Sequence, residues 1–106
     1  MKRVLLVPLL LAATAMAAHA AVPQGAASYT GQELAGGAKI TIAQAQATAL
    51  KTRAGKITDR ELEKEAGGSG LRYSFDIKAH GKTYEVGVDA MTGKVLENKA
   101  EGKNPD

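Results

Sequence analysis

The chain has 106 residues, with 14 basic residues, 11 acidic residues and no cysteine. The absence of cysteine excludes a small domain that is held together by disulfides. Acidic and basic residues are interspersed, whereas a nucleic-acid-binding domain concentrates basic residues in one patch. We therefore expect a single small domain that depends on its apolar core and does not bind nucleic acid.

The first 20 residues have the order of a secretory signal peptide. A basic pair at residues 2–3 precedes an apolar run over residues 4–15, and residues 18–20 read Ala-His-Ala. The run is shorter than the roughly 20 residues that a bilayer-spanning helix needs. We expect cleavage after Ala20 and a periplasmic or secreted mature protein with no membrane span. The alternative is a short helix buried in the folded domain. Without the first 20 residues, 12 basic residues remain against 11 acidic ones, a net charge of +1.

Residues 21–38 are rich in Ala, Gly, Gln and Ser and show no periodicity. Glycine raises the entropy cost of ordering such a segment. The composition predicts a flexible leader. Tyr29 and Leu34 could pack back on the domain or bind a partner, but scattered apolar residues in such a tail are usually incidental.

Residues 40–54 carry the pattern of a helix. Thr41 and Gln44 form a T-x-x-Q capping box, with Ile40 placed as a hydrophobic staple. Gly55 is expected to end the helix as its C′ residue. The apolar side of this helix is built mostly from alanines, which allow a close approach to a sheet.

Residues 56–66 predict a strand with either a bulge or a late start, because its apolar residues Ile57 and Leu62 are at odd separation. A turn over residues 67–70, Gly-Gly-Ser-Gly, leads to the next strand. We expect the register to set Ala66 opposite Leu71. The pairs that follow are Leu62 with Phe75, Asp59 with Lys78, and Glu65 with Arg72.

Residues 71–88 predict a β-hairpin. Apolar residues alternate with polar ones on both sides of His80-Gly81, a two-residue turn whose residues tolerate positive φ. Pairing Ala79 with Lys82 places the apolar residues of both strands on one face. The inner pairs are then Tyr73 with Val88, Phe75 with Val86 and Ile77 with Tyr84, and the outer pairs are Arg72 with Asp89, Ser74 with Gly87 and Asp76 with Glu85.

A last strand is expected over residues 94–98, after a type I turn at residues 90–93 with Gly93 in a G1 bulge. Val95 and Leu96 are adjacent, so the pattern leaves open which of them faces inward. Residues 99–106 are predicted to be a polar C-terminal tail. The fold class is therefore α+β, with one N-terminal helix packed on a three- to four-stranded antiparallel meander sheet.

The order of these motifs resembles the PepSY domain over residues 39–98. The resemblance rests on the helix start, the Tyr-Ser-Phe-Asp-Ile strand at residues 73–77, the Gly-Lys-Thr-Tyr-Glu-Val run at residues 81–86 and, above all, Val-Asp-Ala-Met-Thr-Gly-Lys-Val at residues 88–95. It implies a helix on an antiparallel sheet in an exported protein. It also implies a role in inhibiting or controlling a secreted or envelope peptidase, without catalytic residues to carry over.

The residues themselves indicate no catalytic site. Nucleophilic catalysis needs a nucleophile beside an oriented base, and after residue 20 the chain has no cysteine and one histidine, His80, placed in a turn. The predicted registers align Glu61, Asp76 and Glu85 across three strands of the outer face. This row is either solvated or a weak site for a divalent cation, and no other cofactor is indicated.

Three functions follow from these patterns. The first is a non-enzymatic binding module that modulates a peptidase or another envelope protein, using the unpaired edge of the final or the first strand, to which an extended peptide can add. The charged residues between Lys56 and Glu65 could equally protect that edge from aggregation, which is their more frequent use. The second is an envelope protein that binds a metal or small ligand on its acidic face. The third is a structural module without a discrete site.

Overall fold

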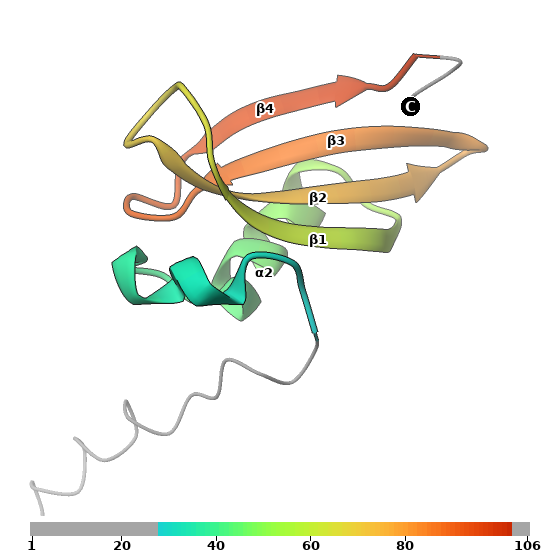
Figure 1. Cartoon of the computed structure of the whole chain (residues 1–106). Coiled ribbons are helices and arrows are strands. Elements are labelled where there is room, and N and C mark those ends of the chain that lie inside the picture. The colour runs from blue at the N-terminus through green and yellow to red at the C-terminus, as the bar shows by residue number, and fades with distance from the viewer. Residues whose placement is uncertain (1–27, 103–106) are drawn as a thin grey trace, which may run out of the picture.

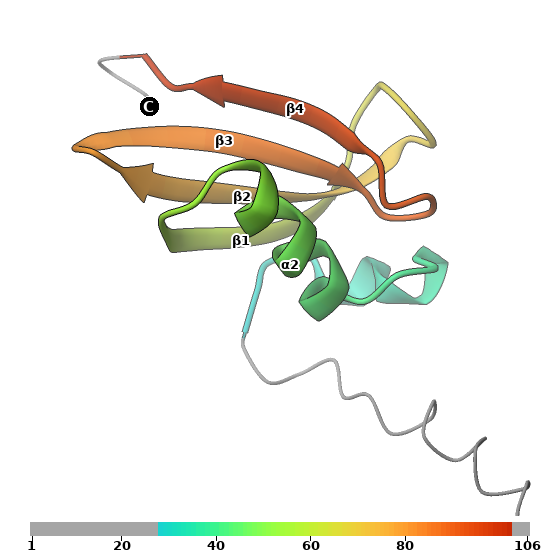
Figure 2. The same cartoon turned by 180° about the vertical axis from the view of Figure 1, so that it is seen from behind.

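Four antiparallel strands form one sheet, and a helix covers one of its faces (Figures 1 and 2). The computed structural model describes residues 28–102. Its elements are the 3-10 helix η2 (Gln32–Gly37), the α-helix α2 (Ile42–Thr52) and the strands β1 (Lys56–Lys64), β2 (Leu71–Ala79), β3 (Lys82–Asp89) and β4 (Val95–Ala100). The strand order is β1-β2-β3-β4, which confirms the predicted α+β meander. We call the face that α2 covers the inner face and the opposite one the outer face. The predicted signal peptide lies outside the described residues.

Helix α2 begins as the sequence predicts. The Gln44 amide N–H donates to Thr41 Oγ1 at 3.1 Å, and the Thr41 N–H donates to Gln44 Oε1 at 2.8 Å, which completes the capping box. The predicted C′ role of Gly55 is wrong, because the helix ends at Thr52 and Arg53 already has extended backbone. Gly55 is instead required by a close approach: a Cβ at this position would lie 2.5 Å from the Lys78 carbonyl oxygen.

The β2–β3 hairpin has the predicted register throughout, from Arg72 opposite Asp89 to Ala79 opposite Lys82. His80 and Gly81 form the turn with φ values of 52° and 77°. These positive values are typical of the type I′ turn, whose twist matches that of the flanking strands. The hairpin therefore delivers alternate side chains of both strands to the inner face.

The predicted β1–β2 register is wrong by two positions. Leu71 pairs with Lys64 rather than Ala66, and a register shift interrupts the ladder between Ile57 and Asp59. The loop over residues 65–70 is longer than predicted because Ser69 is held by Asp89, which draws the loop over the outer face. The even size of the error leaves Leu62 on the inner face, where it is buried. The predicted opposite-charge pairs do not form: Asp59 lies opposite Asp76, and Glu63 rather than Glu65 lies opposite Arg72.

The β3–β4 connection confirms the predicted turn, with Gly93 at φ 82°. A register shift between Gly87 and Val88 leaves neither Val95 nor Leu96 in the core. Strand β4 continues to Ala100, so the tail predicted over residues 99–106 begins later than expected. The register explains this, because Lys99 and Ala100 still pair with β3. Residues 103–106 lie outside the described part of the chain.

The core lies between α2 and the inner face. Its buried apolar residues are Ile42, Ala45, Ala49, Leu62, Tyr73, Phe75, Ile77, Val86, Val88 and Ala90. The alanines of α2 bring the helix close to the strands, and the aromatic and β-branched residues of β2 and β3 provide most of the buried area. The buried Tyr73 hydroxyl donates to the Ile40 carbonyl at 2.9 Å, which ties the start of the helix to the sheet.

The predicted flexible leader over residues 21–38 is wrong for its second half. Tyr29 and Leu34 are not incidental but pack against the core, and the Tyr29 ring meets the Tyr73 ring edge-on at 6.3 Å. Residues 28–38 follow the β1 side of the inner face, where they lie beside α2 (Figure 1). The composition of the segment does not predict this packing, because the stabilisation comes from a few apolar residues that contact a strand distant in the sequence. Residues 21–27 lie outside the described part of the chain.

The capping box gives a direct test of the helix. Thr41→Ala removes the acceptor for the Gln44 N–H and should lower the free energy of unfolding by about 1 kcal/mol. Thr41→Ser keeps the acceptor and should remain close to the wild type. Urea denaturation of both variants measures the difference. Equal stabilities of the alanine and serine variants would contradict the role of this cap.

Candidate functional site

The predicted acidic row is only partly assembled. Glu61, Asp76 and Glu85 all lie on the outer face, and Asp76 stands opposite Glu85 as expected. Glu61, however, stands opposite Ser74, and Asp59 takes the predicted place of Glu61 opposite Asp76. The change follows from the two-position error in the β1 register. The row that forms is therefore Asp59, Asp76 and Glu85.

The pKa values of Asp76 and Glu85 are raised, first by burial and then by neighbouring carboxyl groups. Burial, a hydrogen bond shared with the Glu101 carboxyl group and the charges of Glu101 and Asp59 raise the pKa of Asp76 to about 6. Burial and then neighbouring carboxylates also raise the pKa values of Glu61 and Glu85. Within residues 28–102, no three carboxyl or histidine side chains are grouped closely enough to hold a metal ion. The outer face thus carries a cluster of carboxyl groups whose charges repel one another.

Asp89 is the carboxylate that sequence reasoning missed. It is 1% exposed, and it accepts hydrogen bonds from the Ser69 N–H and hydroxyl and from the N–H groups of Met91 and Thr92, at 2.7–3.1 Å. Burial opposes its ionisation, but these donors prevail and lower its pKa to about 2. Asp89 therefore ties the β1–β2 loop to the β3–β4 turn. An aspartate at the start of a turn is a typical acceptor for the following N–H groups, and this signal was available in the sequence.

Arg72 lies beside this junction and is also buried, at 6% exposure. It pairs with Glu97 at 3.1 Å and donates to the Ala66 carbonyl at 3.0 Å. Gly87 makes room for it, because a Cβ there would lie 3.1 Å from the guanidinium. Arg72 and Asp89 thus fix one end of the outer face as structural groups.

The outer edge of β1 carries the candidate docking site. The Thr30 N–H donates to the Arg60 carbonyl at 3.2 Å, and the Leu62 N–H donates to the Thr30 carbonyl at 2.8 Å, which makes a parallel bridge. Gly31, at φ 90°, then turns the chain away into η2. Thr30 is the only residue in the described part of the chain that pairs with this edge.

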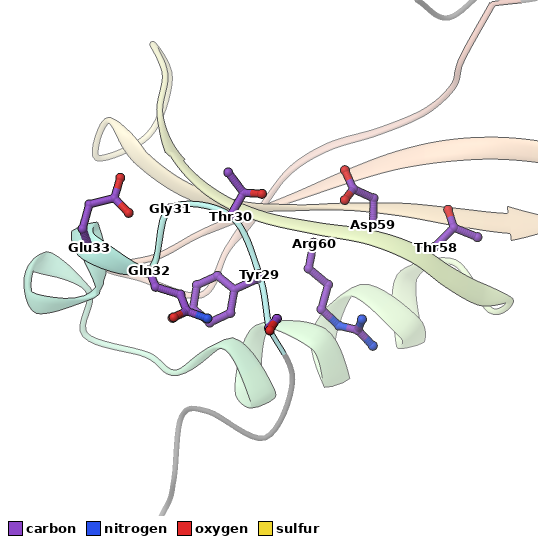
Figure 3. A pocket seen from close by; sticks show the side chains of 9 residues that line it. Tyr29, Thr30, Gly31, Gln32, Glu33, Thr58, Asp59 and Arg60 are labelled. Carbon is purple, nitrogen blue, oxygen red and sulfur yellow. The ribbon is translucent and has the colours of Figure 1, made fainter.

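An open groove of about 590 Å³ lies between residues 28–33 and residues 58–60 (Figure 3). Arg60 extends from β1 toward α2 and donates to Gln46 Oε1 at 2.8 Å, whereas Asp59 points to the other side of the strand. The groove is lined mainly by hydroxyl, amide and charged groups. Its form suits a segment of main chain better than a compact apolar ligand, which favours a more enclosed apolar pocket.

A comparison with protein families matches residues 39–99 to PepSY, described as "Peptidase propeptide and YPEB domain". The match covers more than half of the chain. The chain belongs to the PepSY family. Searches of curated proteins and of solved structures give no significant match.

The PepSY match begins at residue 39 and thus contains α2 and nearly all of the sheet, and also the Asp89 junction. Residues 28–38, which include the Thr30 bridge, precede it. The outer edge of β1 therefore lies within the matched region, whereas Thr30, which pairs with this edge, precedes it. Among residues 28–102, no helix is long and apolar enough to cross a membrane.

The raised pKa of Asp76 predicts a pH dependence of stability. The pKa of Asp76 is about 6 in the folded state, whereas its ordinary value, which applies to the unfolded chain, is 3.8. Between these two pH values the folded state therefore binds more protons than the unfolded state does. Stability should therefore fall as pH rises from about 4 to about 6. Asp76→Asn should be more stable than the wild type at pH 7, and the difference should vanish toward pH 4. Glu33→Gln, on exposed η2 away from the outer face, is the control. Thermal melts across this range measure the effect, and parallel curves for wild type and Asp76→Asn would contradict it.

Asp89 should act in the opposite direction. Its pKa is lowered from 3.8 to about 2, so its stabilisation is present above about pH 4 and is lost as pH falls toward 2. Asp89→Asn should cost about 2 kcal/mol at pH 7, because several N–H groups lose a charged acceptor. Ser69→Ala removes one of these bonds and should cost less. Urea denaturation at pH 7 and pH 2.5 should show the gap between wild type and Asp89→Asn narrowing at the lower pH; a constant gap would exclude a charged Asp89.

Proposed function

We propose that this PepSY protein is an exported, non-enzymatic binding module that modulates a peptidase or another envelope protein. Family membership supports the general role, since the family is described by peptidase propeptides and YPEB. Export rests on the signal-peptide pattern of residues 1–20. The proposal places binding at the sheet edge rather than in an enclosed cavity.

The observation that carries this proposal is the outer edge of β1. Apart from the Thr30 bridge, its main chain has no strand partner among residues 28–102. An extended segment can add to such an edge through main-chain hydrogen bonds, with little demand on its sequence. The cleft and surface loops of a peptidase offer segments of this kind, and the groove beside residues 58–60 leaves room for one.

The hydroxyl and imidazole groups of the domain favour a non-catalytic role. His80, the only histidine in the described range, is exposed in the hairpin turn at φ 52°. The Ser69 hydroxyl donates to Asp89, whose pKa of about 2 makes it too weak a base to activate a nucleophile near neutral pH. These groups are better explained by the turn and the loop junction that they form.

Incubation with secreted metallopeptidases tests the proposal. We expect the purified protein to lower the rate of peptide hydrolysis by at least one of them, in proportion to its concentration, and to co-elute with it on a sizing column. Thr58→Pro, at the edge beside the groove, should weaken both effects because proline lacks the N–H that an added strand would use. Lys51→Ala, on the exposed side of α2, should leave them unchanged. Unchanged hydrolysis and separate elution across a panel of such enzymes would contradict the proposal.

A further inference from the structure

The segment at residues 28–31, which we call the strap, sits on the β1 edge as an added strand would. Its Thr30 makes the two main-chain hydrogen bonds of a parallel bridge with Arg60 and Leu62. Tyr29, the residue before it, turns its ring to the inner face against Tyr73, while Thr30 points to the other side (Figure 3). The strap therefore has the alternation of a β-strand.

The strap pairs over only one residue. Gly31 has φ 90°, and the chain leaves the edge there to form η2. A Cβ on Gly31 would overlap the Leu62 carbonyl oxygen. The position thus requires glycine both for its backbone conformation and for its contact with β1.

We propose that the strap is a built-in occupant of a peptide-binding edge, and that an extended polypeptide segment from a partner protein takes its place. The strap shows the chemistry of this segment: an aromatic residue that packs on Tyr73, followed by a small polar residue that bridges β1. The inference rests on the proposed function, for which it names the surface and the kind of partner.

Displacement is favoured by the shortness of the strap. An extended segment that continues past the Gly31 position keeps both bonds of the bridge and adds bonds farther along β1, toward Lys64. It also follows the open groove toward Thr58 in the other direction. The strap competes with the incoming segment because it is covalently tethered beside the edge, which gives it an effective concentration in the millimolar range.

The test measures binding of a fluorescein-labelled peptide with the sequence of residues 28–34 to the purified protein. Gly31→Ala should release the strap and bind the peptide about tenfold or more tightly than the wild type does, since the tethered competitor is gone. Gly36→Ala is the matched control, because a Cβ there meets nothing within 4 Å, and it should behave as the wild type. A peptide carrying Tyr29→Ala should lose most of its affinity for the Gly31→Ala protein.

The Leu62 amide provides a second readout at the site itself. Its hydrogen exchange should accelerate in Gly31→Ala, because it loses the Thr30 carbonyl, and should slow again when the peptide is added. Should Gly31→Ala not fold, Thr30→Pro removes one donor of the bridge without adding an atom beside Leu62, and the same comparison applies. A folded variant with an accelerated Leu62 amide that binds the peptide no better than the wild type would overturn the inference.

This assay contains no peptidase, so the two proposals fail separately. If the peptide binds to the opened edge but the protein has no effect on peptidases, peptide binding at the β1 edge is supported and the peptidase role is contradicted. If the wild type and Gly31→Ala inhibit peptidases equally and neither binds the peptide, the peptidase role is supported and peptide binding at the β1 edge is contradicted.

Discussion

The two-residue turn at His80-Gly81 fixes the register of the β2–β3 hairpin, and the arrangement of both sheet faces follows from it. With Ala79 opposite Lys82, alternate residues of both strands reach α2. A slip of one residue would place Phe75 and Val86, which are both buried, on opposite faces and turn one of them to the solvent. The same register places Asp76 opposite Glu85 on the outer face. One local constraint therefore builds the core and also concentrates negative charge on the opposite side of the sheet.

Two carboxylates of the outer face illustrate how surroundings decide whether a charge stabilises a small domain. Asp89 is the more buried of the two, yet its donors from Ser69, Met91 and Thr92 stabilise its charged form. Burial raises the pKa of Asp76, and the neighbouring carboxyl groups add to this effect. The Asp89 junction links the β1–β2 loop to the β3–β4 turn through hydrogen bonds alone. Its bonds depend on the charge of Asp89, and this makes the junction sensitive to acid.

Local features of this fold could be predicted from the sequence, and non-local ones could not. The Thr41 capping box and the His80-Gly81 hairpin depend on residues close together in the chain. The β1 register depends instead on Ser69 reaching Asp89, twenty positions away, and on a bulge near Ile57. The candidate site divides in the same way. Asp76 opposite Glu85 follows from the hairpin, whereas the position of Glu61 and the docking of the strap required contacts that no periodicity records.

The strap and α2 cover the same face of the sheet, but they are held by different means. Helix α2 contributes three residues to the core and is fixed at its start by the Tyr73 hydroxyl. The strap is held at the edge by two main-chain bonds and one aromatic contact. Segments with few buried contacts open at a lower free energy than the core does. Opening the strap would expose the β1 edge while leaving the ten-residue core in place. The region that matches PepSY contains that core and that edge but not the strap, so displacement of the strap would leave the matched region in place.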